Sequence, residues 1–169
     1  QLVEALLDPG CYPHPVRHIQ HVETHISHLL LTGDYVYKLK KPLNLGFLDF
    51  STLDKRRFYC EEELRLNRRL APDVYLAVVT FNGEAAAPCI NGSGPVLDYA
   101  VKMRQFDPAS TLDRLDELAQ LSLQQVDTIA STLAAFHAHI PCVPDDSPWG
   151  RAATIWQPVT ENFQQIVLQ

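Results

Sequence analysis

Two sets of residues have the types and spacing for chemistry. The first set is four histidines, His18, His21, His25 and His28, whose 3-4-3 spacing would place all of them on one side of a helix, where they could bind zinc. The segment that carries them is rich in Ile, Val and Thr, which favours a strand. On a continuous strand, His18 and His28 lie on one face. His21 and His25 lie on the opposite face, so the sequence predicts no metal site.

The second set is a lysine and a glutamate from two different elements. Lys38 lies in the alternating run Tyr-Val-Tyr-Lys-Leu-Lys, and Glu63 completes the 3-4 spacing of an apolar stripe on a helix. A carboxylate inside an apolar stripe needs a partner, because burying it without one is costly. A lysine fixed in this way can orient the phosphates of a nucleotide. Lys40 and Glu62 are the alternative members of the pair. The apolar positions of the stripe are Tyr59, Leu66 and Leu70.

Each member of this pair also has an interpretation without a pocket. A lysine on an exposed edge strand discourages aggregation, and Lys38 taken alone fits that role. Glu63 belongs to the run Glu61-Glu62-Glu63 and could be one of several solvated carboxylates. The phase of Glu63 on the helix favours the buried position. The choice of Lys38 as its partner rests also on the family resemblance described below, which implies an ion pair between Lys38 and Glu63.

The strands that carry these residues follow from hydrophobic alternation. The sequence predicts strands at 28–32 and 34–40, joined by a tight turn at Gly33-Asp34. Tyr35, Tyr37 and Leu39 would then face one side of the sheet, and Val36, Lys38 and Lys40 the other. Two further strands are expected at 74–81 and 96–106.

The helices follow from capping residues and from a change of period. A long helix opens with Ser51 and Asp54 as a capping box and carries Glu63. Beyond residue 108 the pattern becomes helical. One helix there begins with a capping box of Ser122 and Gln125, and a last helix is expected to start near Pro158. A strand-rich part followed by a helical part predicts an α+β fold.

Composition and charge narrow the classes of function. The 169 residues are 46% apolar and 20% charged, which is the profile of a packed protein rather than a disordered one. The net charge of −6, and the lack of aromatic residues interleaved with Arg65, Arg68 and Arg69, argue against nucleic acid as a partner. No apolar run is long enough to cross a bilayer, so we expect no membrane partner. The four cysteines form no C-x-x-C pair, which favours inert thiols and a cytoplasmic location.

Two segments resemble a known family. They are residues 24–79, THISHLLLTGDYVYKLKKPLNLGFLDFSTLDKRRFYCEEELRLNRRLAPDVYLAVV, and residues 98–106, DYAVKMRQF. In this order they resemble the amino-terminal half of bacterial aminoglycoside-phosphotransferase-like proteins, which are often fused to a P-loop ATPase domain. The resemblance covers most of residues 12–140. It implies a protein-kinase-like fold and ATP-dependent phosphoryl transfer to a small-molecule hydroxyl, with an attached P-loop ATPase domain as a candidate partner.

The resemblance also implies a domain organisation. Residues 1–106 would form a nucleotide-binding lobe, made of an antiparallel sheet and one long helix. Residues 107–169 would form the first helices of a truncated helical lobe. In the first lobe, Lys38 would orient the α- and β-phosphates of ATP, and Glu63 would fix Lys38. Val36 would touch the adenine ring.

Further contacts with ATP are implied at the two ends of the same pocket. Met103, Arg104 and Gln105 end the last strand, and their main-chain groups would contact adenine. Thr24 and Ser27, with nearby backbone N–H groups, would touch phosphate. The run between the first two strands reads VETHIS, so the glycine-rich loop of such lobes is missing there.

The catalytic parts of such a protein are also missing. The sequence contains no His-x-Asp, so we expect the catalytic loop and the Mg²⁺ ligands after Gln169, and no catalytic residue within the 169-residue chain. We therefore expect this chain to be inactive by itself. Two functions stay open for it: part of an ATP-dependent phosphotransferase, or a non-catalytic kinase-like module that binds a nucleotide or a partner and regulates an attached domain.

Overall fold

The computed structural model describes residues 2–144 and 146–167, and its chain divides into two compact units, Gln1–Ala119 and Gln120–Gln169. The fold is α+β, as the sequence predicts: a six-stranded antiparallel sheet with several helices. The predicted lobe boundary after residue 106 concerns a nucleotide-binding role and stays a prediction. Among the residues described, no helix is both long and apolar enough to cross a membrane.

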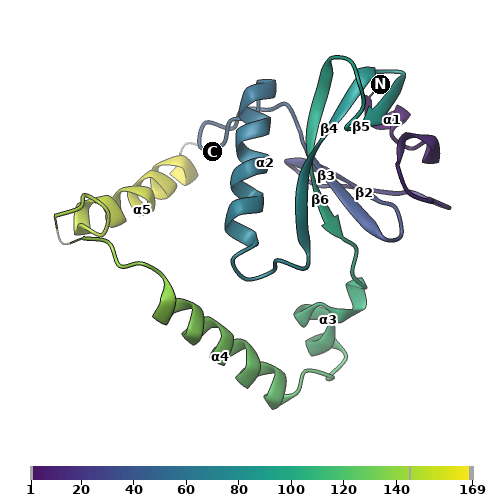
Figure 1. The fold of residues 1–169 in the computed structure, drawn as a ribbon. Helices are drawn as coiled ribbons and strands as arrows, with labels where there is room; N and C mark the ends of the chain where they lie inside the picture. Colours follow the sequence, from purple (N-terminus) through teal and green to yellow (C-terminus); the bar gives the residue numbers. More distant parts are fainter. Residues whose placement is uncertain (1, 145, 168–169) are drawn as a thin grey trace. The chain divides into compact units, whose positions relative to one another are not determined.

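The sheet lies in the first unit and is antiparallel throughout (Figure 1). Its strand order is β1-β2-β3-β6-β4-β5. The strands are β1 (Gln20–Glu23), β2 (Ser27–Leu31), β3 (Tyr35–Lys40), β4 (Tyr75–Glu84), β5 (Ala87–Ile90) and β6 (Val96–Arg104). The order places β3 in the interior of the sheet, between β2 and β6. An interior strand positions its side chains more firmly than an edge strand would.

The two faces of β3 have different environments, because successive side chains of a strand point to opposite faces. Tyr37 and Leu39 are buried in the main apolar core, and Tyr35 packs against that core. Lys38 and Lys40 instead contact helix α2 (Leu53–Asn67), which covers the other face (Figure 1). The predicted alternation along this strand is therefore confirmed.

The main core is closed by a segment for which the sequence analysis predicts no element. It consists of residues 2–12, which include α1 (Leu2–Ala5) and the 3-10 helix η1 (Pro9–Cys11). Leu6, Cys11 and Tyr12 from this segment are buried with residues of the sheet. The Tyr12 hydroxyl also donates a hydrogen bond of 2.7 Å to the carbonyl oxygen of Leu6. The amino-terminal residues thus cover one face of the sheet while α2 covers the other.

Helix α2 begins later than predicted and presents a different stripe. Its N-cap is Thr52 rather than Ser51, because Ser51 is held by the Asp49 carboxylate through both its N–H and its hydroxyl. Leu66 and Leu70 of the predicted stripe are 46% and 48% exposed, so that stripe is wrong. The buried residues of the helix are Arg56 and Cys60, and Glu63 lies one turn further along the same face.

The remaining helices follow the sheet in the sequence. The 3-10 helix η2 (Pro108–Ser110) and α3 (Leu112–Glu117) belong to the first unit, and α4 (Leu123–His139) and α5 (Ala152–Val167) to the second. The predicted capping box of Ser122 and Gln125 is confirmed at the start of α4. The predicted start of the last helix near Pro158 is wrong. Helix α5 begins at Ala152 and contains Pro158, because the N–H of Ile155 already donates to the carbonyl oxygen of Arg151.

Candidate functional site

The centre of the candidate site is a carboxylate held by two lysines. The Nζ atom of Lys38 lies 2.8 Å from Oε1 of Glu63, and the Nζ atom of Lys40 lies 2.6 Å from Oε2 of the same residue. The expected ion pair between Lys38 and Glu63 is therefore present. Lys40, predicted as the alternative to Lys38, also contacts Glu63, so both lysines bind the same carboxylate. Glu62, the alternative acid, pairs with Arg65 on the exposed side of the helix.

The three side chains are buried to different degrees. The exposed fraction is 27% for Lys38, 6% for Lys40 and 13% for Glu63. Burial pushes the pKa of the Glu63 carboxyl upward, but the hydrogen bonds and charges of Lys38 and Lys40 outweigh that effect and leave the pKa below its ordinary value. Glu63 is consequently an anion at neutral pH. Two ammonium groups and one carboxylate leave a net charge of about +1 at this point.

A cavity of about 300 Å³ lies beside these residues on the α2 side of β3. Lys38 belongs to its wall, whereas Lys40 and Glu63 are not part of the wall. Most of the wall is apolar, and its two cationic residues are Lys38 and Arg104. Such a cavity suits a flat apolar ring that carries an anionic group. The lining residues are Leu29, Leu31, Val36, Lys38, Val74, Tyr75, Met103, Arg104, Gln105, Phe106 and Pro108.

Five of the predicted ATP-contacting residues line this cavity. They are Val36, Lys38, Met103, Arg104 and Gln105, and the antiparallel pairing of β3 with β6 brings them together, with Val36 opposite Met103. Two of the main-chain N–H groups predicted to contact adenine are already hydrogen-bonded within the protein. The N–H of Arg104 donates to the carbonyl oxygen of Val74, and the N–H of Gln105 to that of Asp34. These two donors already have partners within the fold.

Thr24 and Ser27 do not line the cavity but lie at the β1–β2 turn. The Thr24 hydroxyl closes this turn: it accepts the N–H of Ser27 at 3.0 Å and donates to the Ser27 carbonyl oxygen at 3.2 Å. The Ser27 hydroxyl is fully buried and has no hydrogen-bond partner within residues 2–144 and 146–167. Ser27 is paired in register with Lys40 on the neighbouring strand. The phosphate role of both residues stays a prediction.

The histidines are arranged differently from the predicted pattern. Nε2 of His21 and Nδ1 of His28 lie 3.1 Å apart, although the sequence places them on opposite faces. The prediction assumed one continuous strand. The turn between β1 and β2 reverses the chain, so both side chains come to the same face of the hairpin. In the described part of the chain, no three His, Cys, Asp or Glu side chains are grouped so that they could hold a metal ion.

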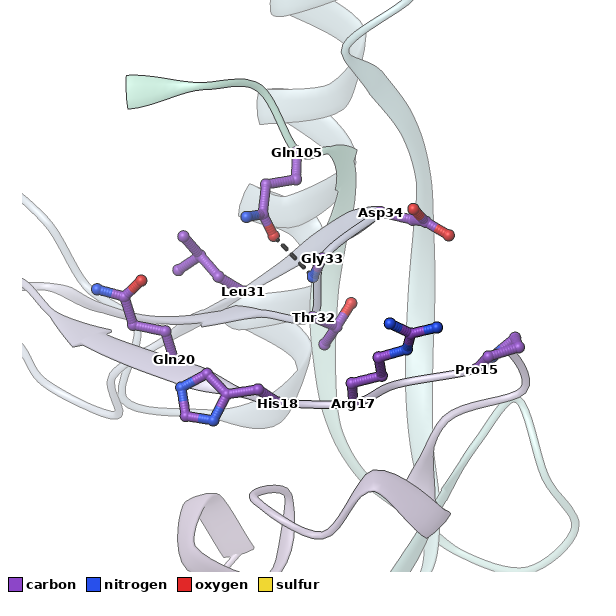
Figure 2. A pocket seen from close by; sticks show the side chains of 9 residues that line it. All are labelled: Pro15, Arg17, His18, Gln20, Leu31, Thr32, Gly33, Asp34 and Gln105. Carbon is purple, nitrogen blue, oxygen red and sulfur yellow. Dashed lines mark hydrogen bonds between the residues drawn. The ribbon is translucent and has the colours of Figure 1, made fainter. Parts of the chain in front are cut away.

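A second hollow, of about 430 Å³, adjoins the first and shares Leu31 and Gln105 with it. Figure 2 shows it at the turn between β2 and β3, with Arg17 and His18 contributed by the segment before β1. The Oε1 atom of Gln105 accepts a hydrogen bond of 3.0 Å from the N–H of Gly33 (Figure 2). Gln105 therefore ties this turn to the wall that separates the two hollows.

Sequence reasoning missed most of the apolar wall of the cavity. Leu29 and Leu31 alternate along β2 and are paired in register with Lys38 and Val36, so the pairing of the two predicted strands could have identified them. Val74 and Phe106 fall within the predicted strands at 74–81 and 96–106 but lie just outside the observed β4 and β6, and the sequence analysis assigns residues 103–106 to the adenine contact.

The chain is similar to three curated mycobacterial proteins, each described only as uncharacterized. One is from Mycobacterium bovis and two are from strains of Mycobacterium tuberculosis. Each is 30% identical over 165 residues, which cover 94% of this chain and 31% of the relative. The chain thus spans about a third of the length of the curated relatives it matches. No family model and no solved structure matches the chain.

Proposed function

We propose that the first unit is a kinase-like nucleotide-binding lobe that takes ATP, and that it belongs to a phosphotransferase acting on a small-molecule hydroxyl. The observation that carries the proposal is a single arrangement: Lys38 lies at the margin of an apolar cavity and is bound by Glu63, which Lys40 also binds. ATP has the same division into an apolar ring and an anionic tail. The cavity volume of about 300 Å³ lies at the lower end of the range for small-molecule sites.

In this proposal the adenine ring lies between the apolar side chains of β2 and β3 and those near the end of β6. Val36 and Met103, which are opposite each other in the sheet, would form the base of that slot. The phosphates would then extend toward Lys38 and its net positive surroundings. Phosphoryl transfer requires a cation at this point, because its transition state carries charge on the phosphate oxygens. Mg²⁺ and the catalytic base would come from residues beyond the 169 of this chain.

The β1–β2 turn favours a second candidate, a non-catalytic nucleotide- or partner-binding module. In kinase-like lobes a flexible glycine-rich loop covers the phosphates. Here the corresponding turn contains no glycine, and its Thr24 hydroxyl is used within the turn. A closed turn of this kind offers fewer donors to a triphosphate. Such a module would bind adenosine and ATP with similar affinity.

The test is isothermal titration calorimetry with ATP, with and without Mg²⁺, and with adenosine. Lys38→Met should weaken ATP binding by about tenfold or more, because it removes a charge-assisted contact to phosphate. Adenosine binding should be unaffected. Lys55→Met is the matched control, since Lys55 is a lysine paired with Asp49 outside the cavity. Lack of ATP binding at millimolar concentration, or an equal loss in both variants, would refute the proposal.

A further inference from the structure

We propose that Lys40 is a positioning residue, which holds Glu63 to the sheet permanently and so leaves Lys38 free to contact phosphate. The inference deepens the proposed function and rests on it. It divides two roles between the two lysines of one strand. One lysine stays with the carboxylate, and the other exchanges the carboxylate for the ligand.

The geometry allows both lysines to bind at once. Each uses a different oxygen of the carboxylate, Lys38 the Oε1 atom at 2.8 Å and Lys40 the Oε2 atom at 2.6 Å. Neither contact therefore has to break for the other to form. When Lys38 moves toward a phosphate, the Oε2 contact of Glu63 remains in place.

Burial separates the two roles. Lys38 is 27% exposed and forms part of the cavity wall, so its ammonium group can reach a ligand there. Lys40 is only 6% exposed and lies outside that wall. Its Nζ atom lies 4.9 Å from the centre of the Phe50 ring, which gives the cation a second favourable contact. Lys40 is thus confined between Glu63 and Phe50, in a place that the ligand does not reach.

Charge gives the reason for having two lysines. With one lysine only, a nucleotide that attracted Lys38 would leave the Glu63 carboxylate buried without a cation, and that cost would be subtracted from the binding energy. With Lys40 in place, the carboxylate keeps its counter-ion throughout. The pair of Lys40 and Glu63 is neutral, and the charge of Lys38 is available to the phosphates.

The distinguishing measurement is proton uptake on binding Mg²⁺–ATP, obtained by calorimetry in buffers of different ionisation enthalpy. Wild type should take up no proton at Glu63, because Lys40 keeps its carboxylate ionised. Lys40→Met should bind about tenfold more weakly at pH 7 and take up a proton, since Glu63 loses its last cation when Lys38 moves to the phosphates. Lys40→Arg should restore binding without uptake. Lys41→Met is the matched control, because Lys41 pairs with Glu23 instead.

A second measurement needs neither a variant at Lys40 nor a nucleotide. The titration of the Glu63 carboxyl, followed by carbon-13 NMR in Lys38→Met, should still show a pKa below the ordinary value, because Lys40 remains. A pKa at or above that value would overturn the inference, as would wild-type affinity without proton uptake in Lys40→Met. Failure of wild type to bind Mg²⁺–ATP would refute the proposed function alone, while this titration would still decide the role of Lys40.

Discussion

Glu63→Gln tests the two-lysine contact by changing a charge and almost no volume. The variant leaves two ammonium groups facing a neutral amide, and one of them, on Lys40, is 6% exposed. Removing one partner of a buried ion pair costs about 3–5 kcal/mol. Lys38 can turn toward solvent, so its share is small and the lower end of this range applies. We expect the free energy of unfolding of the first unit to fall by about 3 kcal/mol at pH 7.

The effect should depend on pH with a definite sign. The pKa of Glu63 is lowered in the folded state from an ordinary value of 4.5, so the ionised carboxylate stabilises the fold above that value. This stabilisation is lost as the pH falls through the lowered pKa. The difference in the free energy of unfolding between wild type and Glu63→Gln should therefore be constant from pH 6 to 7 and disappear at acid pH. Other carboxyls titrate alike in both proteins and cancel.

The assay is urea unfolding followed by near-ultraviolet circular dichroism of tyrosine. All six tyrosines lie in the first unit, whereas both tryptophans lie in the second, so tryptophan fluorescence would report on the wrong unit. Glu62→Gln is the matched control, because Glu62 is on the same helix but pairs with the exposed Arg65. It should leave the free energy of unfolding almost unchanged. An equal loss in both variants, or a difference that persists at acid pH, would refute the reasoning.

Three further predictions concern single residues of the first unit. Cys60 is 0% exposed, and its burial raises the pKa of the thiol to about 12. Iodoacetamide at pH 8 should therefore label the exposed Cys89 well before Cys60, as measured by peptide mass spectrometry. Similar labelling rates at the two cysteines would contradict the packing of α2. Leu6→Ala should destabilise this unit by about 2–5 kcal/mol in the tyrosine-monitored urea assay, since Leu6 is fully buried; a loss under about 1 kcal/mol would mean that the amino-terminal segment does not pack on the sheet. Gly33 has a φ of +100° and open space where a Cβ would lie, so Gly33→Ala should cost about 1 kcal/mol from backbone strain alone, and a neutral result in the same assay would contradict that conformation.

The sequence predicts those features that depend on neighbours along the chain. The alternation of β3 is one example, because successive side chains of any strand point to opposite faces. The capping box of Ser122 and Gln125 is another, since its hydrogen bonds join residues three positions apart. The inward position of Glu63 was also predicted, but from a stripe that includes two exposed leucines, Leu66 and Leu70. The position is correct and the argument for it is not.

Features that depend on contacts distant in sequence could not be predicted in this way. Arg56 and Cys60 of helix α2 are buried against the sheet. From the sequence alone Arg56 is expected at the surface, because its partner Asp98 lies on β6, distant in the sequence. The sequence indicates no partner for the N–H of Gln105, which donates to the carbonyl oxygen of Asp34 in the turn between β2 and β3. The contact of His21 with His28 likewise depends on where the hairpin turns.

Helix α2 is held to the sheet largely through charged groups. Nε of Arg56 lies 2.8 Å from Oδ1 of Asp98 on β6, and Glu63, about two turns further along, binds the two lysines of β3. Arg68, at the C-cap, donates to the carbonyl oxygens of Tyr75 and Leu76 at 2.9 Å each.

An apolar interface would tolerate a shift of the helix along the sheet, whereas these polar contacts would each be broken by it. Buried ion pairs add little net stability compared with apolar packing, but each is costly to leave unpaired. The arrangement therefore fixes the register of the helix more than it strengthens the fold. A helix in fixed register keeps Glu63 beside Lys38 and Lys40, and it is this placement that the proposed contact with phosphate requires.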